Sequence, residues 1–268
     1  MKFWRTGSWR RRLIAPSTIV LWLLLSSCEQ DGSSGNSRPV LRVAVAGNFA
    51  TPHRELALLF SAATGVEIET SLGATGQLYA QIKNGAPYDI FLAADTTRPA
   101  LLEEEGLAVQ GIRFTYAIGR LALYAPTWDS VRDGELELRS RTIQHLAIAN
   151  PQTAPYGAAA IDVLARWGLN DDFETRIVRG ENVPQAFQFV ESGASEAGFV
   201  ALSHVIGRRT RHYWIVPDSL HSPIRQDAVL LQHGRSNPYA RDYLEFLHGE
   251  AGRGVIARFG YSLPLENR

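Results

Sequence analysis

At four places in the sequence an apolar strand is expected to be followed by a helix, and polar residues stand at three of them. Asn48 precedes the first such helix, Thr75 the second and Tyr156 a helix in the middle of the chain, while Val183 begins a later one. Helix N-termini expose backbone N–H groups without partners and carry roughly half a positive charge each. Several of them together form an anion site that needs no Lys or Arg. Each residue alone is typical of an ordinary cap, so only the set indicates binding.

The elements that must position these residues alternate short apolar runs with helical patterns, which is typical of βαβ units and a largely parallel sheet. Strands are expected at 41–46, 66–71, 88–95, 114–124, 145–151, 197–202 and 228–231, and helices at 51–65, 75–84, 98–105, 156–167, 184–191, 238–248 and 252–259. In the first helix Thr51-Pro52 is expected to supply the cap and first turn, with Leu56, Leu59, Phe60 and Ala63 on one buried face. Open α/β sheets bind ligands at the carboxyl ends of their strands, which is where the four corners between strand and helix lie.

The first 27 residues are typical of a secretory signal peptide, with five basic residues, no acidic residue and the apolar run 13–25. The run ends in Leu-Ser-Ser-Cys, which resembles the bacterial lipobox and implies cleavage before Cys28 and attachment of lipid to its sulfur. An incidental cysteine after an ordinary signal peptide is the alternative. Arg10 to Arg12 also allow export by the twin-arginine route. Residues 28–38, rich in Gly and Ser, are expected to form a flexible tether.

The charge balance and the cysteine count exclude some classes of function. Without the signal peptide, 22 basic residues face 27 acidic ones, a net charge of −5, so the basic footprint of a nucleic-acid-binding protein is absent. Cys28 is the single cysteine, so the chain cannot form an internal disulfide and its stability must come from core burial.

Five stretches of the sequence together closely resemble the periplasmic molybdate-binding proteins of ABC importers: VAVAGNFA, LGATGQLYAQIKNGAPYDIFLAAD, RFTYAIGRLALYAP, IANPQTAPYGAAA and EAGFVAL. The resemblance implies the type II periplasmic-binding-protein fold, in which two α/β lobes are joined by two extended crossings, here near residues 116–121 and 222–227. Lobe one would comprise residues 39–117 plus 226–268, and lobe two residues 118–225.

The same resemblance implies that the ligand contacts are made by Gly47, Asn48, Ala74, Thr75, Tyr156 and Val183. Molybdenum would be bound as molybdate through these residues, with no separate cofactor. Many family members have a ligand-contacting tyrosine at the position of Ala201, whereas the pairing of Asn48 with Tyr156 matches another branch of the family. Tyr156 is therefore expected to reach the site from a different loop.

The resemblance also implies the protein's partners and location. It predicts a monomeric receptor in the periplasm or on the cell surface, anchored through Cys28, that delivers molybdate or tungstate to a membrane permease with a cytoplasmic ATPase. One alternative keeps the binding function but changes the ligand to sulfate, thiosulfate or a phosphonate.

The alternative of a different class is an enzyme on the same fold. Asp89 and Asp95 flank the strand IFLA and could in principle act as acid and base, although such residues are more often caps or turns. The sequence contains no Gly-x-Ser-x-Gly elbow, phosphate loop or His-Glu-x-x-His motif. No titratable group is expected to converge on the four corners, which favours binding over catalysis.

Overall fold

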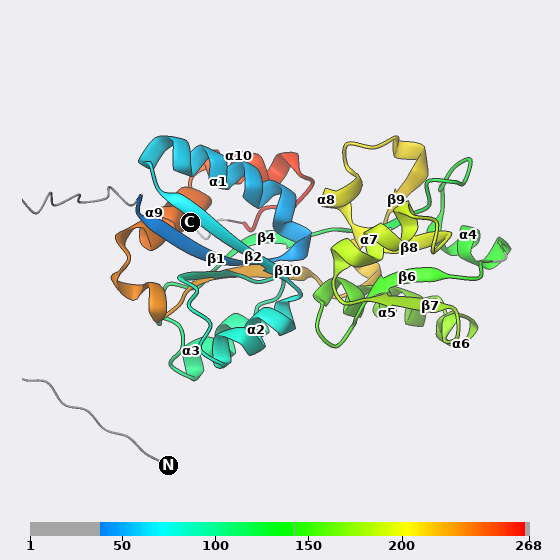
Figure 1. The fold of residues 1–268 in the computed structure, drawn as a ribbon. Helices are drawn as coiled ribbons and strands as arrows, with labels where there is room; N and C mark the ends of the chain where they lie inside the picture. Colours follow the sequence, from blue (N-terminus) through cyan, green and yellow to red (C-terminus); the bar gives the residue numbers. More distant parts are fainter. Residues whose placement is uncertain (1–37, 142, 266–268) are drawn as a thin grey trace, which may run out of the picture. The chain divides into compact units, whose positions relative to one another are not determined.

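The computed structural model describes residues 38–141 and 143–265, which form two five-stranded sheets with helices on both faces of each (Figure 1). The predictions about the signal peptide and Cys28, and nearly all of the tether prediction, fall outside the described residues. Within the described part of the chain, no helix is both long enough and apolar enough to cross a bilayer.

The first sheet has the strand order β2-β1-β3-β10-β4. β1 pairs in parallel with β2 and β3, whereas β10 pairs antiparallel with β3 and β4. The strands are β1 Val40–Ala46, β2 Glu67–Gly73, β3 Ile90–Leu92, β4 Phe114–Gly119 and β10 Ile224–Leu230.

The second sheet has the order β7-β6-β8-β5-β9 and repeats the same pattern of directions. β6 pairs in parallel with β7 and β8, and β5 pairs antiparallel with β8 and β9. The strands are β5 Leu121–Tyr124, β6 Leu146–Ala149, β7 Ile177–Gly180, β8 Ala197–Ala201 and β9 Tyr213–Ile215. Four of the five strands in each sheet therefore run in the same direction, and the single reversed strands are β10 and β5. Both sheets are mixed but largely parallel, as the sequence predicted.

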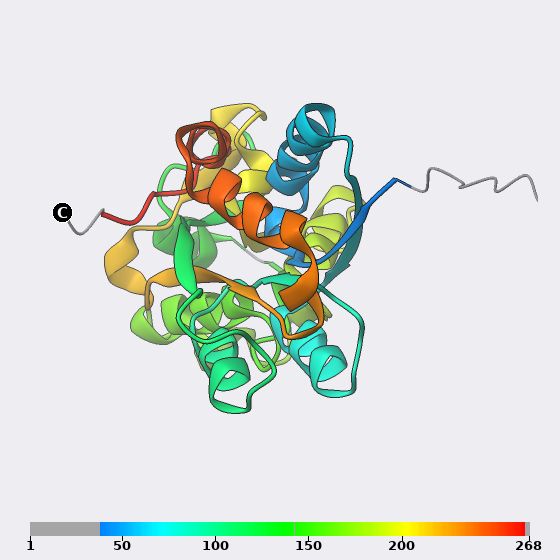
Figure 2. The same ribbon diagram turned by 90° about the vertical axis from the view of Figure 1, so that its left-hand side faces the viewer.

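Helices cover both faces of the first sheet (Figures 1 and 2). One face packs against α1 (Ala50–Thr64), α9 (Pro238–His248) and α10 (Glu250–Arg258) through a core that includes Leu56, Tyr243 and Ile256. The other face packs against α2 (Thr75–Lys83) and α3 (Thr97–Glu104) through Leu78, Ile82 and Leu102.

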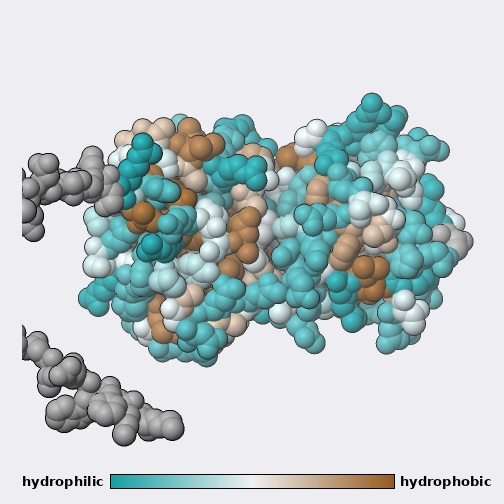
Figure 3. All heavy atoms as spheres, viewed as in Figure 1, coloured by the Kyte–Doolittle hydropathy of each residue, from teal (hydrophilic) through white to brown (hydrophobic). Residues whose placement is uncertain are grey.

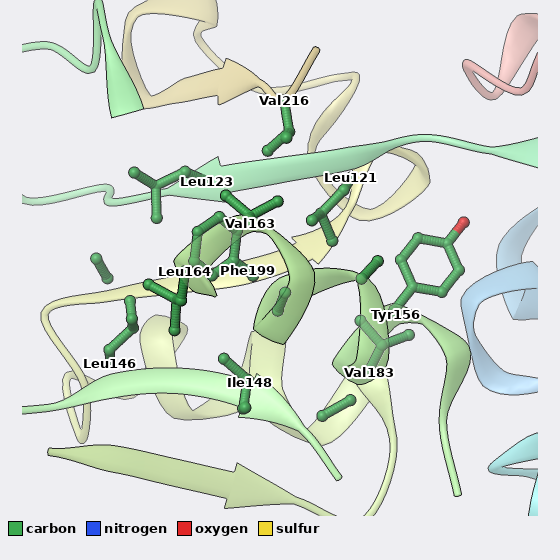
Figure 4. Packing of buried hydrophobic residues seen from close by; sticks show 14 of the residues in the cluster. Leu121, Leu123, Leu146, Ile148, Tyr156, Val163, Leu164, Val183, Phe199 and Val216 are labelled. Carbon is green, nitrogen blue, oxygen red and sulfur yellow. The ribbon is translucent and has the colours of Figure 1, made fainter. Parts of the chain in front are cut away.

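The second sheet is covered in the same way. Figure 4 shows the core on one face, where Val163 and Leu164 of α5 pack against Leu121, Ile148 and Phe199 of the strands. The helices on that face are α4 Gly134–Ser140, α5 Pro155–Arg166 and α6 Asn170–Phe173, and those on the other are α7 Val183–Glu191 and α8 Leu202–Val205. Short 3-10 turns complete the described elements: η1 Gly47–Phe49, η2 Thr210–His212, η3 Asp218–Leu220 and η4 His233–Ser236.

The chain passes between the sheets twice. The apolar run 114–124 contains two strands: β4 belongs to the first sheet and β5 to the second, and the chain changes sheet at Arg120, where the resemblance implied a crossing near residues 116–121. The return runs from β9 to β10 through residues 216–223. Two connections between two α/β units are the architecture of the type II periplasmic-binding-protein fold.

The first helix differs from the sequence expectation. It begins at Ala50 directly after η1, and no side chain caps it, so Thr51 is not its cap. Its buried face contains Leu56 and Phe60, whereas Leu59 is 46% exposed and Ala63 is also exposed, because both fall on the flank that turns to solvent. Exposed apolar side chains such as Leu59 are not exceptional here. Figure 3 shows patches of hydrophobic surface between hydrophilic ones on the unit that contains the first sheet.

Candidate functional site

A small cavity lies where the helix ends of the two sheets meet. Its volume is about 10 Å³, so its walls lie close together. Its lining consists of Ala46, Gly47, Asn48, Gly73, Ala74, Thr75, Ala94, Ala154, Pro155, Tyr156, Asn182 and Val183. All six residues singled out in the sequence are among them, so the fold brings four separate corners to one point.

Three helix N-termini face this cavity. α2 begins at Thr75, α5 at Pro155 and α7 at Val183. The first N–H groups of a helix have no partner within it. Because proline has no N–H, α5 first offers the N–H of Tyr156, and Pro184 leaves Val183 as the leading donor of α7. These ends bring partial positive charge to the cavity without any basic side chain.

At the start of α2, some hydrogen-bond donors already have partners in the protein and others do not. The N–H of Ala74 donates to Gln77 Oε1 at 3.2 Å, and the N–H of Gly76 donates to the carbonyl of Thr153 at 2.9 Å. Thr75 Oγ1 accepts from the N–H of Ala94 at 3.0 Å, so its hydroxyl hydrogen remains available for another acceptor. Thr75, more than Ala74, therefore has hydrogen-bonding capacity for a ligand.

Asn48 is buried and lies within η1, so it does not directly precede a helix as the sequence suggested. Its side-chain Nδ2 donates to Gln226 Oε1 at 2.9 Å and to the hydroxyl of Tyr261 at 3.0 Å. Both amide hydrogens are thus taken by protein acceptors. The donor of Asn48 that remains is its backbone N–H, which lies in the first turn of η1 and has no partner within that turn.

Tyr156 points its hydroxyl away from the apolar core of the second sheet (Figure 4). The hydroxyl accepts a hydrogen bond from Gln226 Nε2 at 3.2 Å. Burial, the largest cause, raises the pKa of Tyr156 well above its usual value of 10, so the side chain is a neutral phenol at physiological pH. Ala201 is buried in β8 and does not line the cavity, so Tyr156 approaches from α5 instead.

The cavity is electrically neutral apart from its dipoles. Among its lining residues, all of them in the described part of the chain, Tyr156 has the one titratable side chain. The neighbouring tyrosines are neutral as well: burial raises the pKa of Tyr261 to about 12 and that of Tyr116 well above 10. The arrangement can donate hydrogen bonds to an anion but supplies no acid or base near neutral pH.

The two carboxylates considered as an acid–base pair lie elsewhere. Asp95 accepts from the N–H of Arg98 at 2.9 Å and so caps the start of α3, as expected for a cap residue. Asp89 accepts from the N–H of Arg42 at 2.8 Å and from His233 Nδ1 at 3.0 Å. Neither lines the cavity.

The sequence interpretation missed a buried polar network behind the cavity. Gln226 contacts Asn48, Tyr116 and Tyr156, and the hydroxyl of Tyr261 donates to the backbone carbonyl of Asn48 at 2.7 Å. Gln226 is 0% exposed, although it stands between Arg225 and Asp227 in the sequence. Three consecutive polar residues are typical of an exposed segment, so no local pattern marked Gln226 as a buried side chain that needs partners.

Comparison with known protein families and sequences gives a consistent result. The model of the bacterial extracellular solute-binding protein family matches residues 41–262. The molybdate-binding protein ModA of Azotobacter vinelandii is 47% identical over 226 residues, covering 83% of this chain and 90% of the relative. ModA of Rhodobacter capsulatus is 43% identical over 218 residues, covering 81% of this chain and 86% of the relative.

Solved structures agree with the sequence matches. The periplasmic molybdate-binding protein of Azotobacter vinelandii superposes with a TM-score of 0.81 at 37% identity, covering 84% of this chain and 100% of that one. The sulfate-binding protein SubI of Mycobacterium tuberculosis superposes with a TM-score of 0.68 at 15% identity, covering 84% of this chain and 87% of that one. At that identity the likeness shows the shared fold alone.

Proposed function

Because the chain belongs to the bacterial extracellular solute-binding protein family, we propose that it captures molybdate between its two α/β units and delivers it to an ABC importer. Two relatives at 47% and 43% identity are named molybdate-binding proteins, as is a solved structure at 37%. The observation that carries the proposal is the small cavity where three helix N-termini and the η1 turn meet without a charged side chain. The protein binds and transports its ligand and is not an enzyme.

The ligand contacts follow from the donors that remain unused. We assign the hydroxyls of Thr75 and Tyr156 and the backbone N–H groups of Asn48, Thr75, Tyr156 and Val183 to the oxygens of the anion. Gly47 and Ala74 shape the wall between these donors. A hydrogen bond to a charged acceptor contributes about 1.5 to 3 kcal/mol, so about half a dozen of them offset the cost of desolvating the ion and give an affinity in the submicromolar range.

The donor set suits molybdate by its chemistry. A tetrahedral dianion accepts hydrogen bonds at all four oxygens and donates none, whereas a protonated phosphate brings an O–H that must find an acceptor. The protein contacts molybdenum only through the oxygens of the ion. Tungstate, which has nearly the same size, binds comparably in this proposal. Sulfate has the same charge and shape, so cavity size must discriminate against it.

The start of the chain fits a receptor held at a membrane. The Leu-Ser-Ser-Cys sequence supports lipid attachment at Cys28 after removal of residues 1–27. The importer partner is a permease with a cytoplasmic ATPase, and the receptor acts as a monomer. Radioactive palmitate should label the protein in cells, and Cys28→Ala should abolish the labelling. Persistent labelling of that variant would place the lipid elsewhere.

Titration calorimetry of the purified protein tests the ligand assignment. Molybdate and tungstate should bind with one site per chain and submicromolar dissociation constants, while phosphate should give no heat at the same concentrations. Sulfate binding as tight as molybdate binding would replace the proposal with a sulfate receptor. An absence of binding to all four ions would overturn the oxyanion assignment itself.

A further inference from the structure

We propose that Gln226 is a positioning residue of the oxyanion site, which orders the hydrogen bonds of Asn48 and Tyr156 so that Tyr156 presents its hydroxyl hydrogen to the anion. This inference rests on the proposed function and deepens it. Gln226 does not line the cavity itself and acts through the two residues that do.

The backbone aims Gln226 inward. β10 pairs with β4 through a register shift between Gln226 and Asp227, where Gln226 faces Ala117 and Asp227 faces Thr115. The extra residue at this bulge is Tyr116 of β4, and bulges are common next to functional sites. Gln226 is 0% exposed and Asp227 1%, and the rest of β10 up to Leu230 is also buried, because helices cover both faces of the sheet. The carboxylate of Asp227 accepts hydrogen bonds from Arg113 and Thr115. Gln226 is therefore the one of the two residues that bonds to residues lining the cavity.

The direction of each hydrogen bond follows from Tyr261. Its hydroxyl has two acceptors for its single hydrogen, the backbone carbonyl of Asn48 at 2.7 Å and Ser203 Oγ at 3.2 Å, and with either of them it donates away from the Asn48 side chain. The same hydroxyl must therefore accept from Asn48 Nδ2, 3.0 Å away, which fixes the orientation of the Asn48 amide. The second hydrogen on Nδ2 then donates to Gln226 Oε1 at 2.9 Å.

The fixed orientation of the Gln226 amide determines which hydrogen bond it makes with Tyr156. Its Oε1 accepts from Asn48 Nδ2, which holds the oxygen end of the amide in place. The hydroxyl of Tyr116 also lies 3.1 Å from this oxygen, but its single hydrogen is shared with the carbonyl of Ala93 at the same distance. The nitrogen end then faces the hydroxyl of Tyr156 at 3.2 Å and donates to it. With its oxygen serving as acceptor there, Tyr156 must donate through its own hydrogen, which is directed to the hydroxyl of Tyr261 in this structure and, in this proposal, to the anion when one is bound. An anion in the cavity needs that donor.

The side chains of Gln226 and Tyr156 meet directly against the backbone of Gly119. A Cβ built on Gly119 would lie 2.2 Å from the hydroxyl of Tyr156 and 2.6 Å from Gln226 Nε2. Neither distance is sterically possible, so only glycine at residue 119 leaves both groups in place. Gly119 ends β4, next to the point where the chain crosses between the sheets. The contact between Gln226 and Tyr156 therefore depends on the backbone at the crossing between the sheets.

Three variants and calorimetry with molybdate test this role. Gln226→Met keeps the approximate volume but removes every hydrogen bond, and it should bind molybdate roughly 10- to 100-fold more weakly than wild type. Gln232→Met is the matched control: Gln232 Nε2 donates to the carbonyl of Ala108, away from the cavity, and its loss should leave the affinity within about twofold of wild type. A Gln226→Met affinity within twofold of wild type would overturn the proposal.

Gln226→Glu provides a second measurement, the pH dependence of molybdate affinity, which should not change if residue 226 only fills space. A carboxylate at residue 226 forces Tyr156 to donate to it and places negative charge near the anion, so binding should be weak at pH 8.5. Protonation at lower pH restores an O–H that can donate to Tyr156, so the affinity relative to wild type should recover towards pH 5.5. The facing hydroxyls of Tyr116, Tyr156 and Tyr261 have raised pKa values and stay neutral across this range.

The outcomes separate this inference from the proposed function. If wild type binds molybdate but the Gln226→Glu deficit is the same at every pH, Gln226 is a structural residue and the inference fails. If wild type does not bind molybdate, the proposed function fails and the inference fails with it. Thermal unfolding checks that each variant is folded, and if Gln226→Met does not fold, the pH series of Gln226→Glu decides.

Discussion

The backbone of Gly47 lies directly against the ring of Pro184. A Cβ built on Gly47 would come within 2.7 Å of Pro184 Cγ and 2.9 Å of Pro184 Cδ. Gly47 belongs to the turn after β1 in the first sheet, whereas Pro184 is the second residue of α7, which packs on the second sheet. The lack of a side chain at residue 47 is thus what lets the two walls of the cavity approach each other.

Gly47→Ala should weaken molybdate binding by roughly 10-fold. The added methyl group would collide with a proline ring that is fixed at the start of a helix and cannot swing aside, so the two walls would have to separate. Calorimetry with molybdate measures the effect. Gly254→Ala in α10 is the control, because a Cβ there meets nothing within 4 Å. Equal affinities of the two variants would mean that the contact with Pro184 does not limit the site.

Thr75→Val and Thr75→Ser should differ sharply. Valine removes both the hydroxyl hydrogen assigned to the anion and the acceptor of the Ala94 N–H, so the affinity and the free energy of unfolding should both fall, each by about 1 to 3 kcal/mol. Serine keeps both functions and should stay close to wild type in affinity. The comparison uses calorimetry together with urea unfolding. Wild-type affinity in Thr75→Val would show that the hydroxyl does not contact the ligand.

The affinity for molybdate should depend little on salt. Sites that rely on exposed Lys or Arg weaken as salt screens their charges, but here buried backbone and hydroxyl dipoles do the work. Between 50 and 500 mM sodium chloride we expect a change in dissociation constant of less than about threefold. A steep loss of affinity over that range would point to a basic side chain outside the cavity lining as a contributor.

Acid should destabilise the protein through a buried histidine in α1. His53 lies between Thr70 Oγ1 and the hydroxyl of Tyr243, each 2.9 Å away, and burial lowers its pKa to about 4. The unfolded chain, with a pKa near 6.5, binds this proton more readily, so the stabilising effect is complete above pH 6.5 and is lost as the pH falls towards 4. The loss is about 1.4 kcal/mol per pH unit in that window.

Urea unfolding between pH 4.5 and 7.5 measures that slope. His53→Gln should reduce it, and the same substitution at the exposed His145 should leave it unchanged. Burial also lowers the pKa of His204 to about 4, so part of the slope should remain in His53→Gln. An unchanged slope in His53→Gln would show that His53 does not become charged on unfolding.

The sequence predicted the corners better than the sheets. Glycines, prolines and capping residues are local signals, so the starts of α2, α5 and α7 could be placed to within one residue at Thr75, Tyr156 and Pro184. Strand direction depends on which strands become neighbours, and apolar patterning does not report it. The apolar pattern of the run 114–124 did not by itself indicate a change of sheet, and the crossing near residues 116–121 came from the family resemblance alone. The buried face of α1 was misjudged at Leu59 for a similar reason, because tertiary packing decides which flank of an apolar stripe is covered.

The six residues named from the sequence all line one cavity, but their hydrogen bonds could not be predicted. Residues 47, 48, 74, 75, 156 and 183 could be grouped because each stands at the start of an element or carries the family pattern. That Asn48 gives both amide hydrogens to Gln226 and Tyr261 depends on contacts 178 and 213 residues away along the chain. No local pattern encodes such partners, which is why the sequence suggested Asn48 as a side-chain ligand whereas the structure leaves its backbone N–H.

The most direct test of the account is a crystal structure of the protein grown with molybdate, with data collected at the molybdenum absorption edge. The account predicts one strong anomalous peak per chain inside the cavity, with the oxygens of the ion within hydrogen-bond distance of the Thr75 and Tyr156 hydroxyls and of the backbone N–H of Val183. A peak at any other place, or a peak in the cavity whose nearest donors are Lys or Arg side chains, would contradict the claim that neutral groups hold the anion.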